Sequence, residues 1–372
     1  MPMIMSVWAL AAVLSGLGLR WLLARALDAW LDAPNHRSLH ARPVPRVGGF
    51  ALHSAWLAAM LAALAWIAVS AAPSSPGIGA WGVPSFGPWL SAAGGLALAF
   101  AVSATDDRRS LRASARFAVQ SAAALMLAGS FGGDVLLRWP PALGGPVTDG
   151  PLLAVGVAVL LLAILWAMNL FNFMDGADGL AGGMALFGFA TYAVVAWPVS
   201  PFLAVGAAAV SGAAAGFLMF NFPPARVFMG DAGSVPLGYL AAAFGLAGIA
   251  EGAWGWWLPP LAFLPFILDA TVTLLRRAAR RERVWEAHRQ HAYQRLILLG
   301  WTHRRSALAW WGAMAMCSIA CILLSDQKAP VQWVGVVAAT VLHLAAFQAV
   351  DAAWRRHDRS HRTDQAPAGR EP

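Results

Sequence analysis

The sequence predicts an all-α polytopic membrane protein with about eleven transmembrane helices. Hydrophobic residues make up 59% of the 372 residues and charged residues 12%, a composition too apolar for a soluble globular protein. Long apolar stretches recur along the whole chain, and most positive charges fall in every second loop between them. The net charge of +8 therefore reflects membrane topology, and we expect no nucleic-acid partner.

Each apolar stretch has about 18 residues or more, enough to cross the roughly 30 Å hydrocarbon core of a bilayer. The first is expected to be a retained helix, because it is too long for a cleaved signal and its arginines follow the apolar run. Residues 1–353 form one predicted integral membrane domain, and residues 354–372 a disordered cytoplasmic tail. The stretches lie near residues 3–27, 49–72, 87–104, 113–130, 151–170, 181–198, 202–220, 233–250, 256–275, 306–324 and 331–353.

The distribution of positive charge predicts the orientation. Of the 26 Lys and Arg residues, only Arg138 and Lys328 fall in loops on one side of the predicted helices. Cytoplasmic loops carry the excess of Lys and Arg, so the N-terminus should lie outside and the C-terminus in the cytoplasm. Cys317 and Cys321 are four residues apart in one stretch, where packing is expected rather than a disulfide.

The first inner loop, DAPNHRSLHARPVPRVGGF, holds Arg37, His40, Arg42 and Arg46 on a path restricted by prolines and glycines. Such a loop could bind phosphate groups. Contact with anionic lipid headgroups explains the same residues and is the simpler interpretation of this loop alone.

The next inner loop begins with two adjacent carboxylates, Asp106 and Asp107, in the motif TDDRRSL. Adjacent carboxylates repel one another unless a cation or nearby arginines offset the repulsion. A pair at a helix end suits metal binding or proton abstraction. A helix cap within a solvated charge cluster is the alternative.

The stretch NLFNFMDGADGLAGG, from Asn169 to Gly183, interrupts a long apolar run with carboxylates, amides and glycines. Carboxylates are costly to expose to lipid and must face water, a cation or a partner charge. A polar loop between two membrane helices would explain this one stretch equally well.

A third polar turn, NFPPARVFMGDAGS, places Asp231 at the predicted start of a helix. Backbone N–H groups and a carboxylate at such a position can jointly hold a cation and its phosphate. An ordinary N-cap would explain the aspartate alone. Asp269 lies inside a later apolar stretch and is either a site residue or the partner of an arginine or hydroxyl.

The longest inner loop contains HRQHAYQRLILL, in which His288, His291 and Arg295 are spaced i, i+3 and i+7. This spacing predicts that they share one helical face. Histidine with arginine suits a diphosphate better than a metal, because the guanidinium matches phosphate oxygens. Adhesion to anionic lipid is the alternative.

Acids for a divalent cation and bases for phosphates, gathered at the cytosolic face of a membrane protein, suggest an active site that transfers a phosphate-bearing group onto a lipid. A secondary transporter of an anionic substrate is the alternative. Its site would lie near the bilayer midplane, often on paired inverted halves, and no internal repeat is visible here.

The motifs TDDRRSL, NLFNFMDGADGLAGG, NFPPARVFMGDAGS and HRQHAYQRL, in this order and spacing, resemble those of the polyprenyl-phosphate N-acetylhexosamine-1-phosphate transferases. The first loop is similar to the branch that acts in O-antigen and related surface-glycan synthesis. The resemblance implies attack of a polyprenyl (undecaprenyl) phosphate oxygen on the β-phosphorus of a UDP-N-acetylhexosamine, with release of UMP. It implies Mg²⁺, with Mn²⁺ as a substitute, and the bacterial inner membrane; a homodimer is left open.

By the same resemblance, Asp231 binds the metal, with Asn172 as second ligand. Asp106 and Asp107 are the catalytic pair that orients or deprotonates the lipid phosphate, and Asp178 meets the uracil. The implied substrate-binding residues are Asn169, Asp175, Asp178, Asn221, His288, Arg289, His291 and Arg295.

Two departures from the family pattern bear on the substrate. By the resemblance, Val44 stands where many relatives carry threonine, so the first loop has no side-chain hydroxyl at this position. The histidine box is His-Arg-Gln-His rather than three consecutive histidines, which argues against the muramoyl-pentapeptide enzyme and leaves the N-acetylhexosamine undetermined.

Overall fold

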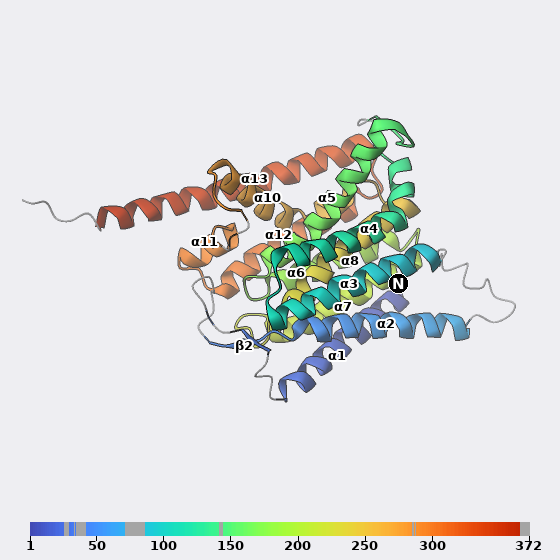
Figure 1. Ribbon diagram of the computed structural model, residues 1–372, viewed down its shortest axis with the longest axis horizontal. Helices are drawn as coiled ribbons and strands as arrows, with labels where there is room; N and C mark the ends of the chain where they lie inside the picture. The colour runs from blue at the N-terminus through green and yellow to red at the C-terminus, as the bar shows by residue number, and fades with distance from the viewer. Residues whose placement is uncertain are drawn as a thin grey trace, which may run out of the picture.

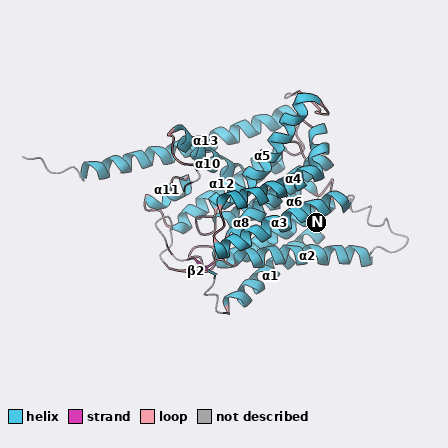
Figure 2. Ribbon diagram, in the orientation of Figure 1, coloured by secondary structure: helices cyan, strands magenta, loops and turns pink. Residues whose placement is uncertain are grey.

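Helices account for almost all of the computed structural model, which describes residues 1–25, 30–32, 34, 42–70, 86–140, 144–284, 286 and 288–364 (Figures 1 and 2). The helices are α1 (Pro2–Leu23), α2 (Gly48–Ser70), α3 (Phe86–Arg109), α4 (Ala113–Leu137), α5 (Gly150–Met174), α6 (Leu180–Ala196), α7 (Pro201–Asn221), α8 (Asp231–Glu251), α9 (Leu258–Ala262), α10 (Leu264–Ala279), α11 (Ala292–Leu298), α12 (His303–Leu324) and α13 (Ala329–Asp364). The predicted all-α membrane fold is confirmed.

Within the described residues, nine helices are long and apolar enough to cross a membrane. The two other predicted spans differ in form. α6 has only 17 residues, and the stretch 256–275 is broken at Phe263 into α9 and α10. Pro265 explains this break, because proline has no N–H to bond the carbonyl of Leu261 and is tolerated in the first turn of a helix, where it lies in α10.

The centre of the bundle is formed by α7 and α8. In their most apolar 18-residue stretches, 83% and 94% of the residues are buried. Small residues along α7 let its neighbours approach closely. A Cβ on Gly212 would lie 2.1 Å from the carbonyl oxygen of Trp8 on α1, and one on Gly216 would lie 2.2 Å from that of Ala12. Close backbone approach of this kind is how membrane helices associate without a hydrophobic driving force between them.

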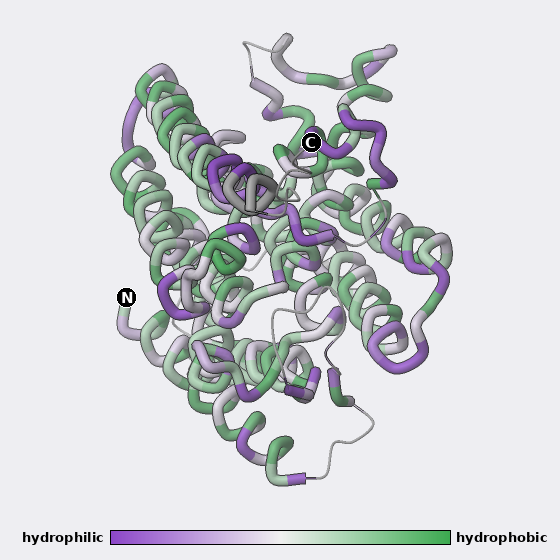
Figure 3. The backbone as a smooth tube through the Cα atoms, turned by 90° about the vertical axis from the view of Figure 1, so that its left-hand side faces the viewer, coloured by the Kyte–Doolittle hydropathy of each residue, from purple (hydrophilic) through white to green (hydrophobic). Residues whose placement is uncertain are grey.

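Hydrophilic residues gather where α3, α5, α7 and α10 end and α4, α6 and α8 begin, which we call the polar end of the bundle. Figure 3 looks onto this end and shows hydrophilic segments joining mostly hydrophobic helices. A short antiparallel pair of strands, β1 (Leu31–Asp32) and β2 (Val44–Pro45), lies here as well. The carbonyl of Pro45 accepts from the Phe228 amide at 2.8 Å, so the first loop is tied to the turn before α8.

The structure bears on two further predictions, one about the first inner loop and one about the C-terminal tail. Arg37 and His40 lie outside the described residues, whereas Arg46 pairs with Asp32. The disordered tail was expected from residue 354, but α13 continues through Asp364. A helix that already spans the membrane needs no new nucleation to extend into the polar residues that follow, which explains the difference.

Candidate active site

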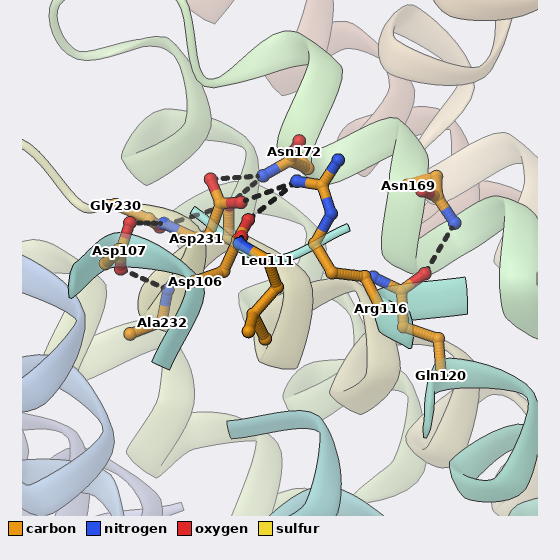
Figure 4. A network of polar contacts seen from close by, with 11 residues as sticks. Asp106, Asp107, Leu111, Arg116, Gln120, Asn169, Asn172, Gly230, Asp231 and Ala232 are labelled. Carbon is orange, nitrogen blue, oxygen red and sulfur yellow. Dashed lines mark hydrogen bonds and ion pairs between the residues drawn. The ribbon is translucent and has the colours of Figure 1, made fainter. Parts of the chain in front are cut away.

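Asp107, near the end of α3, caps the N-terminus of α8. Its carboxylate accepts hydrogen bonds from the backbone amides of Asp231 at 3.0 Å and Ala232 at 2.8 Å (Figure 4). These amides are among the four that a helix leaves unsatisfied at its start. Gly230 has a φ of 72°, and a Cβ there would lie 2.8 Å from the Asp107 carboxylate, so glycine permits the approach. Asp107 thereby fixes the position of Asp231.

Asp106 closes the turn between α3 and α4. It accepts from the Leu111 amide at 2.6 Å and from Arg116 Nη1 at 2.6 Å. The same Arg116 nitrogen lies 3.6 Å from Asp231 Oδ2. Arg116 was not among the predicted site residues. Its position in the first turn of α4 was the available signal, because a cation there opposes the helix dipole and calls for an anionic partner.

Asn172, in the last turn of α5, completes this group. Its amide nitrogen donates to Asp231 Oδ1 at 2.8 Å and to Ser234 Oγ at 3.2 Å. Asn169 lies nearly one turn earlier and donates instead to Gln120 Oε1 at 3.1 Å. We call Asp106, Asp107, Arg116, Asn172 and Asp231 the acidic cluster; four helices, α3, α4, α5 and α8, supply it.

Asp175 directly follows α5 and adds negative charge beside the acidic cluster. Burial first, and then the charges of Asp231 and Asp107, raise the pKa of its carboxyl well above the usual range, while Arg46 opposes the shift. Burial is the largest cause of this shift, and the neighbouring carboxylates add to it.

Asp178 and Asn221 hold the loop between α7 and α8 against the start of α6. Asp178 accepts from the Ala225 amide at 3.0 Å and lies 3.5 Å from His303 Nδ1. Asn221 accepts from the Gly179 amide and donates to the Val227 carbonyl, both at 2.9 Å. Because the backbone engages both ends of the buried Asn221 amide, this residue positions the loop.

Asp269, completely buried in α10, anchors the histidine segment, residues 288–298. It accepts from His291 Nδ1 at 3.2 Å, from the Ala292 and Tyr293 amides at 3.0 and 3.4 Å, and from Thr273 Oγ1 at 3.2 Å. The middle of α10 and the first turn of α11 are thus joined through one carboxylate. The sequence had left the role of Asp269 open, and the structure assigns it to this contact.

The predicted common helical face of His288, His291 and Arg295 is wrong. α11 begins only at Ala292, so both histidines precede the helix, although their ring centroids still lie 4.8 Å apart. Arg295 turns to Asp351 on α13, with Nη1 2.6 Å from Oδ1. Asp269 is the physical cause, since it caps the helix at Ala292, and His291 before it has an extended backbone.

Burial, followed by the charges of His291 and Arg277, lowers the pKa of His288 to about 4. The ring is therefore neutral at neutral pH and can serve as a hydrogen-bonding group. Tyr293 links the segment to the end of α5, because its hydroxyl donates at 3.2 Å to the carbonyl of Phe173, the residue after Asn172. Arg289 is half-buried beside His288.

Among the described residues, no group of three or more His, Cys, Asp or Glu side chains is arranged to hold a metal ion alone. Asp231 Oδ1 and the Asn172 amide nevertheless lie side by side, and Asp231 is 30% exposed. A Mg²⁺ site commonly has one or two carboxylates, with water and substrate phosphates as its other ligands. The donor set fits a cation shared with a phosphate-bearing substrate.

The fold and the site define a polytopic membrane protein with a charged site at one end of its helices. The family model for glycosyl transferase family 4 matches residues 89–249. The chain is 30% identical to a decaprenyl-phosphate N-acetylglucosaminephosphotransferase from Mycolicibacterium smegmatis, over 90% of this chain and 86% of the relative. It is 27% identical to a probable undecaprenyl-phosphate N-acetylglucosaminyl 1-phosphate transferase from Bacillus subtilis, over 80% of this chain and 77% of the relative.

A phospho-N-acetylmuramoyl-pentapeptide-transferase from Thermosynechococcus vestitus is 31% identical over 59% of this chain and 60% of its own. The protein belongs to the polyprenyl-phosphate N-acetylhexosamine-1-phosphate transferase family, as its motifs predicted.

Proposed function

We propose that the protein transfers N-acetylhexosamine-1-phosphate from a UDP-sugar to polyprenyl phosphate and releases UMP. An oxygen of the lipid phosphate attacks the β-phosphorus, and the bond from that phosphorus to the oxygen bridging to the α-phosphate breaks. The observation that carries this proposal is the partly exposed Asp231 carboxylate at the N-terminus of α8, flanked by Asn172 and Arg116. A carboxylate at this position can share a divalent cation with the phosphates of a substrate.

The two aspartates of α3 have different roles in this proposal. Asp107 uses both oxygens to hold the α8 amides and so positions Asp231. Asp106 holds Arg116, whose guanidinium is 40% exposed and can contact a phosphate oxygen while still paired. In-line transfer needs two phosphates held in register, and these contacts supply that orientation.

Asp231 and Asn172 are the residues that would hold Mg²⁺ or Mn²⁺. Asn172 would have to turn its amide so that the oxygen replaces the nitrogen that donates to Asp231. The ion would neutralise charge on the transferring phosphates. Asp175 supports this assignment. Burial first, and then the charges of Asp231 and Asp107, raise its pKa, and a divalent cation would offset those charges.

The relatives matched over 80–90% of this chain are named for N-acetylglucosamine, whereas the muramoyl-pentapeptide relative matches over 59%. We therefore place UDP-N-acetylglucosamine first among donors. The product would be the lipid-linked start of a surface glycan such as O-antigen.

The direct test incubates purified protein with undecaprenyl phosphate, Mg²⁺ and one UDP-sugar at a time, and measures UMP and lipid-linked sugar. We expect UMP with UDP-N-acetylglucosamine and little with the muramoyl-pentapeptide donor. Loss of UMP on chelation should be restored by Mg²⁺. Uptake of an anionic sugar into proteoliposomes without UMP release would favour a transporter instead.

We also propose that the polar end faces the cytoplasm, where UDP-sugars are made. Ser110 and Arg283, both exposed at this end, and Lys328 at the opposite end are suitable positions for single cysteines. Native Cys317 and Cys321 are buried and should stay silent. An impermeant thiol reagent should label Lys328→Cys in intact cells, and Ser110→Cys and Arg283→Cys only after permeabilisation. The reverse pattern would contradict the orientation.

A further inference from the structure

A second charged site lies between α10, α11 and α13 and shares no residue with the acidic cluster. It is a cavity of about 540 Å³ whose lining includes Arg276, Arg280, Arg295 and Arg355. Two acidic residues on α13, Asp351 and Asp358, line it as well, so the cavity carries a surplus of positive charge. Its size falls within the range of roughly 300–1,000 Å³ that is usual for ligand sites.

The buried carboxylate of Asp351 sets two of the arginines in place. Its Oδ2 lies 2.5 Å from Arg276 Nη1, and its Oδ1 lies 2.6 Å from Arg295 Nη1. One negative charge is thus shared between two guanidinium groups, each of which has further N–H donors. The other two arginines are exposed: Arg280 lies 3.8 Å from Glu282, and no carboxylate among the described residues pairs with Arg355.

The position of α13 places the cavity at the depth of lipid phosphates. Only 11% of its most apolar 18-residue stretch is buried, the lowest share of the nine long helices, so the rest of the chain leaves most of α13 uncovered, as expected of a helix that faces lipid. Its apolar run gives way at Asp351 to a segment with Trp354 and Arg355, a change typical of the membrane–water interface. Figure 1 shows α13 passing α10 and continuing beyond the bundle on the side of α11.

We propose that this cavity binds the phosphate group of an anionic phospholipid. Arg280 and Arg355 contact the phosphate from α10 and α13, while Asp351 holds Arg276 and Arg295 beside it. Guanidinium groups match phosphate oxygens in pairs, and the lipid-facing surface of α13 accommodates the acyl chains. The lipid thereby joins α13 to α10 and α11.

The test uses the purified full-length protein and native mass spectrometry in the presence of phosphatidylglycerol or phosphatidylcholine. Wild type should retain phosphatidylglycerol in preference, and Arg355→Gln should weaken its retention about fivefold. Arg356→Gln removes the same charge from the neighbouring exposed residue, which does not line the cavity, and should retain the lipid as wild type does. Arg280→Gln provides a second variant from α10 with the same expected loss.

Equal retention of the two lipids by wild type would overturn the proposal, as would equal losses in Arg355→Gln and Arg356→Gln. Inorganic phosphate provides the third arm. If it raised the Tm as much as phosphatidylglycerol did, and only with Arg355 present, the ligand would be a soluble anion and the lipid assignment would be wrong.

Discussion

The acidic cluster and the histidine segment are built by the same device but differ in what they leave for a ligand. In each, a carboxylate of one helix accepts the first amides of another, Asp107 those of α8 and Asp269 those of α11. α8 has 21 residues packed at the centre of the bundle, whereas α11 has seven at its edge. The difference teaches that the core positions the acidic cluster, while the first turn of α11 depends on the buried carboxylate of Asp269.

The largest effect is expected at Asp231. Asp231→Asn keeps the size of the side chain but removes the charge that would hold a cation, so UMP release should fall at least about 100-fold. The packed α8 should keep the Tm within a few degrees of wild type, as should Asp134→Asn, a control at an exposed aspartate of α4. Near-normal turnover in a folded Asp231→Asn protein would remove the basis of the site.

A smaller effect is expected at the two aspartates of α3, and it should differ between them. Asp107→Asn places an amide against backbone N–H groups and should lower the Tm together with turnover, at a cost typical of a lost cap, about 1 kcal/mol. Asp106→Asn breaks the pair with Arg116 and should change the pH profile of turnover. Identical pH profiles and Tm values for the two variants would show that they are equivalent after all.

Asp269 should connect stability to activity in the histidine segment. Asp269→Asn turns an amide toward groups that all donate, so buried N–H groups lose their acceptor at a cost of about 1–3 kcal/mol. Tm and turnover should fall together, with turnover reduced about tenfold because His291 loses its support. Asp326→Asn, at an exposed aspartate on the opposite end, is the matched control. A variant of normal stability would contradict the dependence on one residue.

The smallest effect is expected from His288. Its pKa of about 4 lies below the ordinary value of 6.5, so the unfolded chain binds the extra proton first as the pH falls. The stability that this neutral ring contributes is present above pH 6.5 and is lost as the pH falls toward 4. His288→Gln should therefore show a shallower fall in Tm over this range, measured by thermal unfolding. Parallel Tm profiles would mean that His288 is not buried as described.

Much of the fold could be predicted because membrane insertion depends on local composition. All eleven predicted stretches coincide with helices, since an apolar run of that length forms a helix wherever it crosses a bilayer. The predicted helix boundaries were wrong where another feature of the chain overrode the apolar composition. Pro265 divided one stretch, and α13 carried its helix past the end of its apolar run.

The partners of the charged residues were decided by the tertiary structure. The sequence by itself brought Asp106, Asp107 and Asp231 to one side of the membrane and indicated chemistry with phosphates. It did not show that Asp107 caps a helix 124 residues away or that Arg295 turns to Asp351. A hydrogen bond needs its two atoms within about 3 Å. Residues far apart in the chain meet at that distance only after the helices between them have packed.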